Sequence, residues 1–195
     1  MRIFKDKERE LDWVSFENIK EKKCQEAIGE INSWSGSPNI ERFIVSGMLC
    51  GDFLTELYSK VSPAFIGSDD RAKRPNDFLY FLYDASLDND TLAGAAYLSN
   101  QTLIDELAVE YLVINPNLQN MGIGTRFVRS LKENMSTLSS RETNNVITTI
   151  VDKENIPSIK LFSKICKPVI SKTIIGNTNK FWYFSSREME KDIKG

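Results

Sequence analysis

The pattern of apolar residues is most distinctive between residues 108 and 135, where an apolar run leads into a glycine loop and then into a helical repeat. Ala108 to Ile114 are mostly apolar or β-branched without a clean two-residue alternation, which is typical of a strand buried on both faces. Asn115 and Pro116 end this strand. The next apolar residues recur at helical spacing and predict a helix that packs on a sheet through one stripe, formed by Ile123, Phe127, Val128, Leu131 and Met135.

The part of the chain before this segment predicts helices followed by a hairpin. Residues 13–19 have the composition of a first strand, and apolar residues at helical spacing predict helices over 24–34 and 43–61, separated by a loop at 35–39. Two β-rich runs, at 78–84 and 91–99, then predict an antiparallel hairpin that leads to the central strand.

The part after the helix predicts a second strand of the same sheet. Residues 146–151 are read as a strand that runs parallel to 108–114 through a right-handed crossover. Asn155 and Pro157 open a short helix, and residues 169–175 and 181–185 predict a final hairpin. The fold class is therefore mixed α/β, and because no linker-like tract divides the 195 residues, we expect one domain over residues 1–195.

The glycine loop predicts an anion site. Gly122 and Gly124 stand where a helix begins, so backbone N–H groups and the positive end of the helix dipole can surround a phosphate or pyrophosphate. No Gly-Lys-Ser or Gly-Lys-Thr triplet follows the loop, which argues against a Walker-type site, and the third glycine of a dinucleotide fingerprint is missing.

Two segments resemble motifs of the GNAT superfamily of N-acyltransferases. Residues 106–125 are similar to its acyl-CoA motif, in which Gln119, Gly122 and Gly124 match the loop of Gln or Arg, two residues, Gly, one residue, and Gly or Ala. Residues 151–162 resemble its later strand-to-helix segment, with Asn155 matching the family's asparagine. The resemblance covers about residues 75–185 and implies a central, mostly antiparallel twisted sheet with a parallel pair at its centre and helices on both faces.

The same resemblance implies acetyl-CoA as co-substrate, without a metal. The pantetheine arm would add to the sheet beside the main chain of Leu112 and Ile114, an amide near Val113 would polarise the thioester carbonyl, and the loop amides would hold the pyrophosphate. The cofactor-binding residues expected in this way are Leu112, Val113, Ile114, Gln119, Asn120, Met121, Gly122, Ile123, Gly124, Thr125, Asn155 and Phe162.

Acetyl transfer to an amine needs a base, because a protonated amine with a pKa of about 10 must lose a proton before attack. Histidine is absent from the chain, so histidine-based triads are excluded. Glu110 lies in the predicted central strand at one position where the family carries an acid, while the other such position holds Ala108. Glu110 is the first candidate, as base or as a charge that holds a cationic acceptor. Glu106 is an even number of residues away, so it faces the same side of the strand, and it is the second candidate.

Phe162 departs from the family's pattern. It stands where many members have a tyrosine that protonates the leaving thiolate, so that proton would come from water, from a neighbour such as Tyr111, or from no group. A thiol with a pKa of about 8.5 can also leave without obligatory protonation. Phe162 also fits a place in the core. The departure leaves open a second function, a non-catalytic module that binds or senses acyl-CoA, and a third, a scaffold without a ligand.

Composition restricts the partners. The chain carries 25 basic and 27 acidic residues with an isoelectric point near 5.4, which gives no bulk attraction for nucleic acid or for an anionic membrane. A charged N-terminus without an apolar signal core, and three cysteines without pairing or metal spacing, lead us to expect a cytoplasmic protein. The acceptor, a small molecule or peptide carrying a primary amine, would lie among the first helices, the loop 62–76 and the hairpins. The edge of the final hairpin leaves a homodimer possible.

Overall fold

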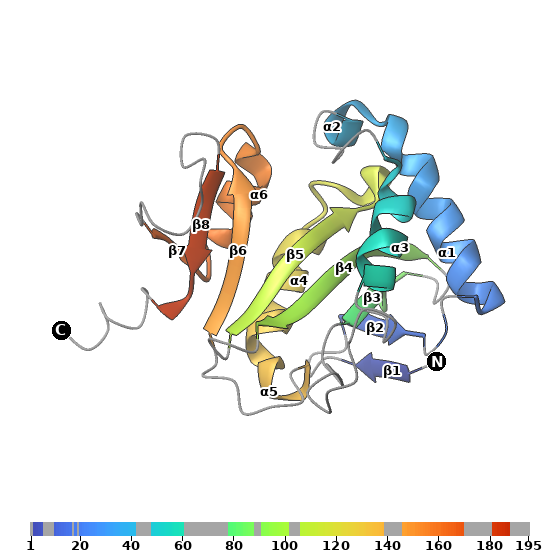
Figure 1. Ribbon diagram of the computed structural model, residues 1–195, viewed down its shortest axis with the longest axis horizontal. Helices are drawn as coiled ribbons and strands as arrows, with labels where there is room; N and C mark the ends of the chain where they lie inside the picture. The colour runs from blue at the N-terminus through green and yellow to red at the C-terminus, as the bar shows by residue number, and fades with distance from the viewer. Residues whose placement is uncertain are drawn as a thin grey trace.

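The computed structural model describes residues 2–5, 10–16, 18, 20–41, 48–60, 78–87, 91–101, 106–138, 146–169 and 181–187, which form a twisted sheet between two layers of helices (Figure 1). Within these residues the sheet has eight strands in the order β1-β2-β3-β4-β5-β6-β8-β7. All neighbours are antiparallel except β5 and β6, which are parallel. The strands are β1 (Arg2–Lys5), β2 (Leu11–Ser15), β3 (Phe78–Asp84), β4 (Leu92–Gln101), β5 (Glu106–Ile114), β6 (Val146–Asp152), β7 (Lys167–Val169) and β8 (Phe181–Ser185).

The helices cover opposite faces of this sheet (Figure 1). On one face, α1 (Lys22–Ser33) and α3 (Cys50–Lys60) pack on β3 and β4 around buried residues such as Ile31, Leu54 and Phe81. On the other face, α4 (Ile123–Glu133), α5 (Met135–Leu138) and α6 (Ile156–Phe162) surround Phe127 and Phe184. The predicted mixed fold with a parallel pair at the centre of the sheet and helices on both faces is confirmed.

The boundaries of several elements differ from the sequence expectations. The segment 35–39 is more ordered than a loop, since it contains the 3-10 turn η1 (Trp34–Gly36) and the start of α2 (Pro38–Glu41). The next helix begins at Cys50, while residues 42–47 of the predicted helix lie outside the described part. At the end of the chain, β8 lies between β6 and β7, and residues 170–180 of the predicted hairpin also lie outside it. The strand β1 was not predicted, because its segment is dominated by charged residues.

A side chain of α1 caps the N-terminus of α3. Asn32 Oδ1 accepts hydrogen bonds from the backbone N–H groups of Gly51 at 2.7 Å and of Asp52 at 3.1 Å. A Cβ at Gly51 would lie 2.5 Å from the carbonyl oxygen of Ile28, so the glycine permits the two helices to approach closely. Among the described residues, no helix has the length and apolarity needed to cross a membrane.

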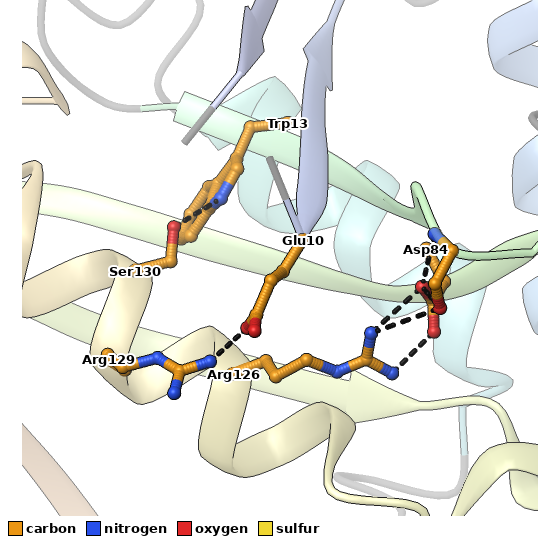
Figure 2. A network of polar contacts seen from close by, with 7 residues as sticks. Glu10, Trp13, Asp84, Arg126, Arg129 and Ser130 are labelled. Carbon is orange, nitrogen blue, oxygen red and sulfur yellow. Dashed lines mark hydrogen bonds and ion pairs between the residues drawn. The ribbon is translucent and has the colours of Figure 1, made fainter. Parts of the chain in front are cut away.

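Polar contacts fasten α4 to the strands β2 and β3 (Figure 2). Trp13 Nε1 donates to Ser130 Oγ at 2.9 Å, Arg129 pairs with Glu10, and Arg126 binds the carboxylate of Asp84, with Nη1 at 2.9 Å from Oδ1. Burial opposes ionisation of Asp84, but its hydrogen bonds with Arg126 and Ser86 outweigh that effect and lower the pKa of the carboxyl. These contacts hold the glycine-led helix at a fixed place behind the sheet.

Candidate functional site

The parallel strands β5 and β6 separate halfway along their length. They pair from Glu106 opposite Val146 to Val109 opposite Thr149, where the Thr149 hydroxyl donates to the Val109 carbonyl at 2.9 Å. Beyond this point β6 continues as the partner of β8, whereas residues 110–114 of β5 have only β4 beside them among the described residues. Figure 1 shows the two strands diverging toward their C-terminal ends. One edge of the upper half of β5 is therefore without a strand partner.

A β-bulge lies at the point where the strands separate. Tyr97 pairs with Tyr111 and Leu98 pairs with Val109, so Glu110 is the extra residue of β5. Glu110 accepts a hydrogen bond from Ser99, and the Tyr111 ring packs on Phe53 of α3 with centroids 5.1 Å apart. The bulge thus turns two consecutive residues, Glu110 and Tyr111, toward the sheet face that carries α1 and α3. This explains why the strand shows no clean alternation.

The register of β4 and β5 determines which peptide groups of β5 face the open edge. The N–H of Asn115 donates to the carbonyl of Ala93 at 2.9 Å, and Ile114 is opposite Gly94. Hydrogen-bonded and non-hydrogen-bonded pairs alternate in an antiparallel ladder, so Val113 directs its peptide groups toward β4. Leu112 and Ile114 direct theirs toward the open edge, as the family resemblance implied. The N–H of Val113 is turned to β4, and a thioester-polarising amide near Val113 stays a prediction.

The glycine loop begins where β5 ends. Asn115 Oδ1 accepts from the N–H of Asn117 at 3.0 Å and starts the turn η5 (Pro116–Leu118). Gln119 then reaches back, and its Nε2 donates to the carbonyl of Ile114 at 3.3 Å. This contact attaches the loop to the open edge of β5 and occupies one of the two lone pairs of that carbonyl.

The turn before α4 is left-handed and exposed. Asn120 has φ 65° and Gly122 has φ 85°, and Gly122 is the N-cap of α4 without a side-chain capping bond. The side chain of Met121 is 59% exposed and Thr125 is also exposed, whereas Ile123 is buried in the core. The first backbone N–H groups of a helix have no intrahelical acceptor. The loop therefore presents these groups at the helix end where the dipole favours an anion.

The second motif packs against the first. A Cβ at Gly124 would lie 3.2 Å from Leu161 Cδ2, so the glycine brings α4 close to α6. Lys164 Nζ donates to Thr125 Oγ1 at 2.6 Å. Asn155 caps α6, since its Oδ1 accepts from the N–H of Ser158 at 3.2 Å. The structure thus explains Gly124 and Asn155 by helix packing and helix capping.

Phe162 lies in the core. Its side chain is 3% exposed and belongs to the cluster on the α4 side of the sheet. Its ring is therefore buried, whereas Ile156 on the same helix is 48% exposed, and a place for Phe162 at the cofactor site stays a prediction. Packing accounts for this residue, in agreement with its place in the helical pattern.

Glu106 is already paired. Its side chain is 5% exposed, it accepts from Tyr183 Oη at 3.1 Å, and it forms an ion pair with Arg187 Nη2 at 3.0 Å. Burial and the neighbouring carboxylate raise the pKa of Tyr183 to about 12, so its phenol stays protonated as the donor. Glu106 also lies in the closed part of the β5–β6 ladder, about 13 Å along the strand from Glu110. The structure therefore disfavours Glu106 as the base.

Glu110, by contrast, is exposed and lies at the separation of the strands. Ser99 is its only recorded side-chain partner in the described part of the chain, and no cation there neutralises it. The sequence reasoning did not find Ser99, Tyr183 or Arg187. The first depends on the register of β4 and β5, and the other two on the order in which β8 joins the sheet.

The remaining reactive groups are buried. The three cysteines are all buried, and burial raises the pKa of Cys24 to about 11 and of Cys166 to about 12. Burial, followed by contact with Cys50, also raises the pKa of Tyr111 above its ordinary value. The phenol of Tyr111 thus points into the α3 side of the core. The predicted acceptor loop 62–76 lies outside the described residues.

Comparisons with known proteins agree with this geometry. The sequence profile of the Acetyltransferase (GNAT) family matches residues 50–167. A search of curated protein sequences finds no match. Among solved structures, an acetyltransferase (GNAT family) from Bacillus anthracis is 15% identical with a TM-score of 0.60, covering 94% of this chain and 97% of that one. A domain from Methanocaldococcus jannaschii is 16% identical with a TM-score of 0.57, covering 90% and 96%. A chimera of the Vibrio cholerae spermidine N-acetyltransferase SpeG and hSSAT is 15% identical with a TM-score of 0.56, covering 90% and 94%.

Proposed function

The chain belongs to the GNAT acetyltransferase family, and from this premise we propose that it transfers an acetyl group from acetyl-CoA to a primary amine, with Glu110 as the base or the acceptor-orienting acid. The observation that carries the proposal is the coincidence of three features at one place. Within the described residues, the edge of β5 without a strand partner, the exposed glycine loop and a carboxylate without a cation partner follow one another along residues 110–125.

The chain's own groups suit the two halves of such a donor. An extended arm that contains amides can bond to the open peptide groups of Leu112 and Ile114 as an added strand would. The diphosphate fits the exposed amides between Gly122 and Thr125, at the positive end of α4. Bound there, acetyl-CoA supplies an electrophilic thioester carbonyl, and the amide of Leu112 is the open-edge donor nearest to the bulge.

Glu110 has the exposure and charge that a base for an ammonium group requires. An amine with a pKa of about 10 is mostly protonated at neutral pH, so a carboxylate both attracts it and, directly or through water, accepts its proton. The nitrogen lone pair then bonds to the acetyl carbon, and the C–S bond breaks to release the CoA thiolate. Phe162 has no proton to give, and the hydroxyl of Tyr183 already donates to Glu106. The thiolate therefore leaves without a proton from Phe162 or Tyr183.

Calorimetry and a thiol-release assay test the proposal. Purified protein is titrated with CoA and acetyl-CoA and then incubated with acetyl-CoA and a panel of amines: polyamines, aminoglycosides, peptide N-termini and lysine. Polyamines belong in the panel because one of the similar structures is a spermidine N-acetyltransferase chimera. We expect binding of CoA and amine-dependent release of free thiol.

The variant Glu110→Gln separates catalysis by the carboxylate from CoA binding. It keeps the size of the side chain and removes the charge, so turnover should fall by at least about tenfold while CoA affinity stays within about twofold. Absence of CoA binding would refute the proposal. Tight CoA binding without transfer to any amine would instead support the non-catalytic module.

A further inference from the structure

A side chain on β4 holds the proposed base. Ser99 Oγ donates to Glu110 Oε1 at 2.7 Å, an ordinary length for an O–H···O hydrogen bond. Ser99 is half-buried, and Glu110 is exposed. The contact joins two neighbouring strands at the point where β5 leaves β6.

The register of β4 and β5 explains this contact. Ser99 is opposite Ala108, so Glu110 is its diagonal neighbour on β5. Diagonal neighbours on the same sheet face lie within reach of long side chains. Leu98 belongs to the cluster on the α4 side, so Ser99 faces the α1 and α3 side, where the bulge also directs Glu110 and Tyr111.

The bond acts on the direction of the carboxylate. It holds the exposed side chain of Glu110 in one orientation, in which Oε1 accepts from Ser99 and Oε2 is left for the acceptor. Among the described residues neither side chain has another hydrogen bond or ion pair, so the contact concerns the direction of Glu110 rather than the fold.

We propose that Ser99 is a positioning residue that orients Glu110 toward the incoming ammonium group through this hydrogen bond. The inference rests on the proposed function, because it assigns Ser99 a part in amine activation. It adds a residue outside the two motifs that identify the family.

The test uses Ser99→Ala, Ser99→Thr and the double variant Ser99→Ala/Glu110→Gln. Ser33→Ala serves as the matched control, since its hydroxyl donates only to the carbonyl of Glu30 on the exposed end of α1. The measurements are kcat and KM for the best amine, the dissociation constant of CoA, and the thermal midpoint.

We expect Ser99→Ala to lower kcat/KM for the amine by about three- to tenfold, because the carboxylate loses the contact that fixes its direction. CoA affinity should stay unchanged. Ser99→Thr, which retains the hydroxyl, should restore most of the rate. In the Glu110→Gln background, Ser99→Ala should have little further effect.

Several outcomes overturn the inference. A wild-type kcat/KM for Ser99→Ala shows that the bond does not act on the base. A loss of rate that Ser99→Thr does not restore, or that multiplies with Glu110→Gln, shows a role in packing. These failures leave acetyl transfer by the wild type intact. Absence of transfer by the wild type itself marks failure of the proposed function, and the inference falls with it.

Discussion

The left-handed conformation of Gly122 gives a prediction whose magnitude follows from the structure. The residue has φ +85°, and a Cβ built there meets nothing within 4 Å. Gly122→Ala therefore introduces no clash and costs only the strain of a left-handed alanine, about 1–2 kcal/mol. Asparagine tolerates this conformation better, so Gly122→Asn should cost less than Gly122→Ala.

Gly29→Ala is the matched control. Gly29 lies within α1, and a Cβ there also meets nothing within 4 Å, but its backbone is helical. Alanine is the better helix former by about 1 kcal/mol, so the same chemical change should stabilise the protein. The free energy of unfolding should therefore fall for Gly122→Ala and rise for Gly29→Ala, and the difference comes from the conformation of the backbone.

Urea unfolding measures both changes in stability, and calorimetry measures the CoA affinity that the loop provides. We expect Gly122→Ala to lower CoA affinity, because any relaxation toward negative φ turns the loop amides away from the anion, and Gly29→Ala to leave it unchanged. If Gly122→Ala is as stable as the wild type and binds CoA equally well, the loop is not left-handed and its amides do not form the site.

Two further predictions concern buried groups. The pKa of Asp84 is lowered in the folded protein, so its pairing with Arg126 stabilises the fold above the unfolded pKa, near 3.8, and this contribution is lost as pH falls through the lower folded value. Urea unfolding at pH 7 should show that Arg126→Met lowers the free energy of unfolding by about 3 kcal/mol. The double variant with Asp84→Asn should recover part of that loss. Cys24, Cys50 and Cys166 are buried, so an aromatic disulfide reagent at pH 8 should react with no more than a small fraction of these thiols until denaturant is added; rapid reaction in the native state would contradict the packing.

Local patterns predicted the elements that pack with regular spacing. The apolar stripes of the segments around Ile31 and Phe127 gave α1 and α4, and β3 and β8 have the predicted bounds. The same spacing also identified Phe162 as a core position. These elements are predictable because burial of one face repeats every few residues along the chain itself.

The contacts of the candidate site depend on register and strand order, which local patterns do not contain. Glu106 and Glu110 do share a face, as parity predicted, but Tyr183 and Arg187 reach Glu106 only because β8 enters the sheet beside β6. Ser99 meets Glu110 because the register of β4 and β5 sets Ser99 opposite Ala108. The absence of alternation in β5 was visible in the sequence and is explained here in part by the bulge.

The central claim is that the open edge of β5 and the loop before α4 bind CoA. Residue-resolved amide exchange, measured by NMR with and without saturating CoA, tests it most directly. We predict that CoA slows exchange at Leu112 and Ile114 and at the amides from Gly122 to Thr125, while Val113, whose N–H is turned to β4, changes little. Unchanged exchange at these amides, or protection confined to other parts of the chain, would contradict the account.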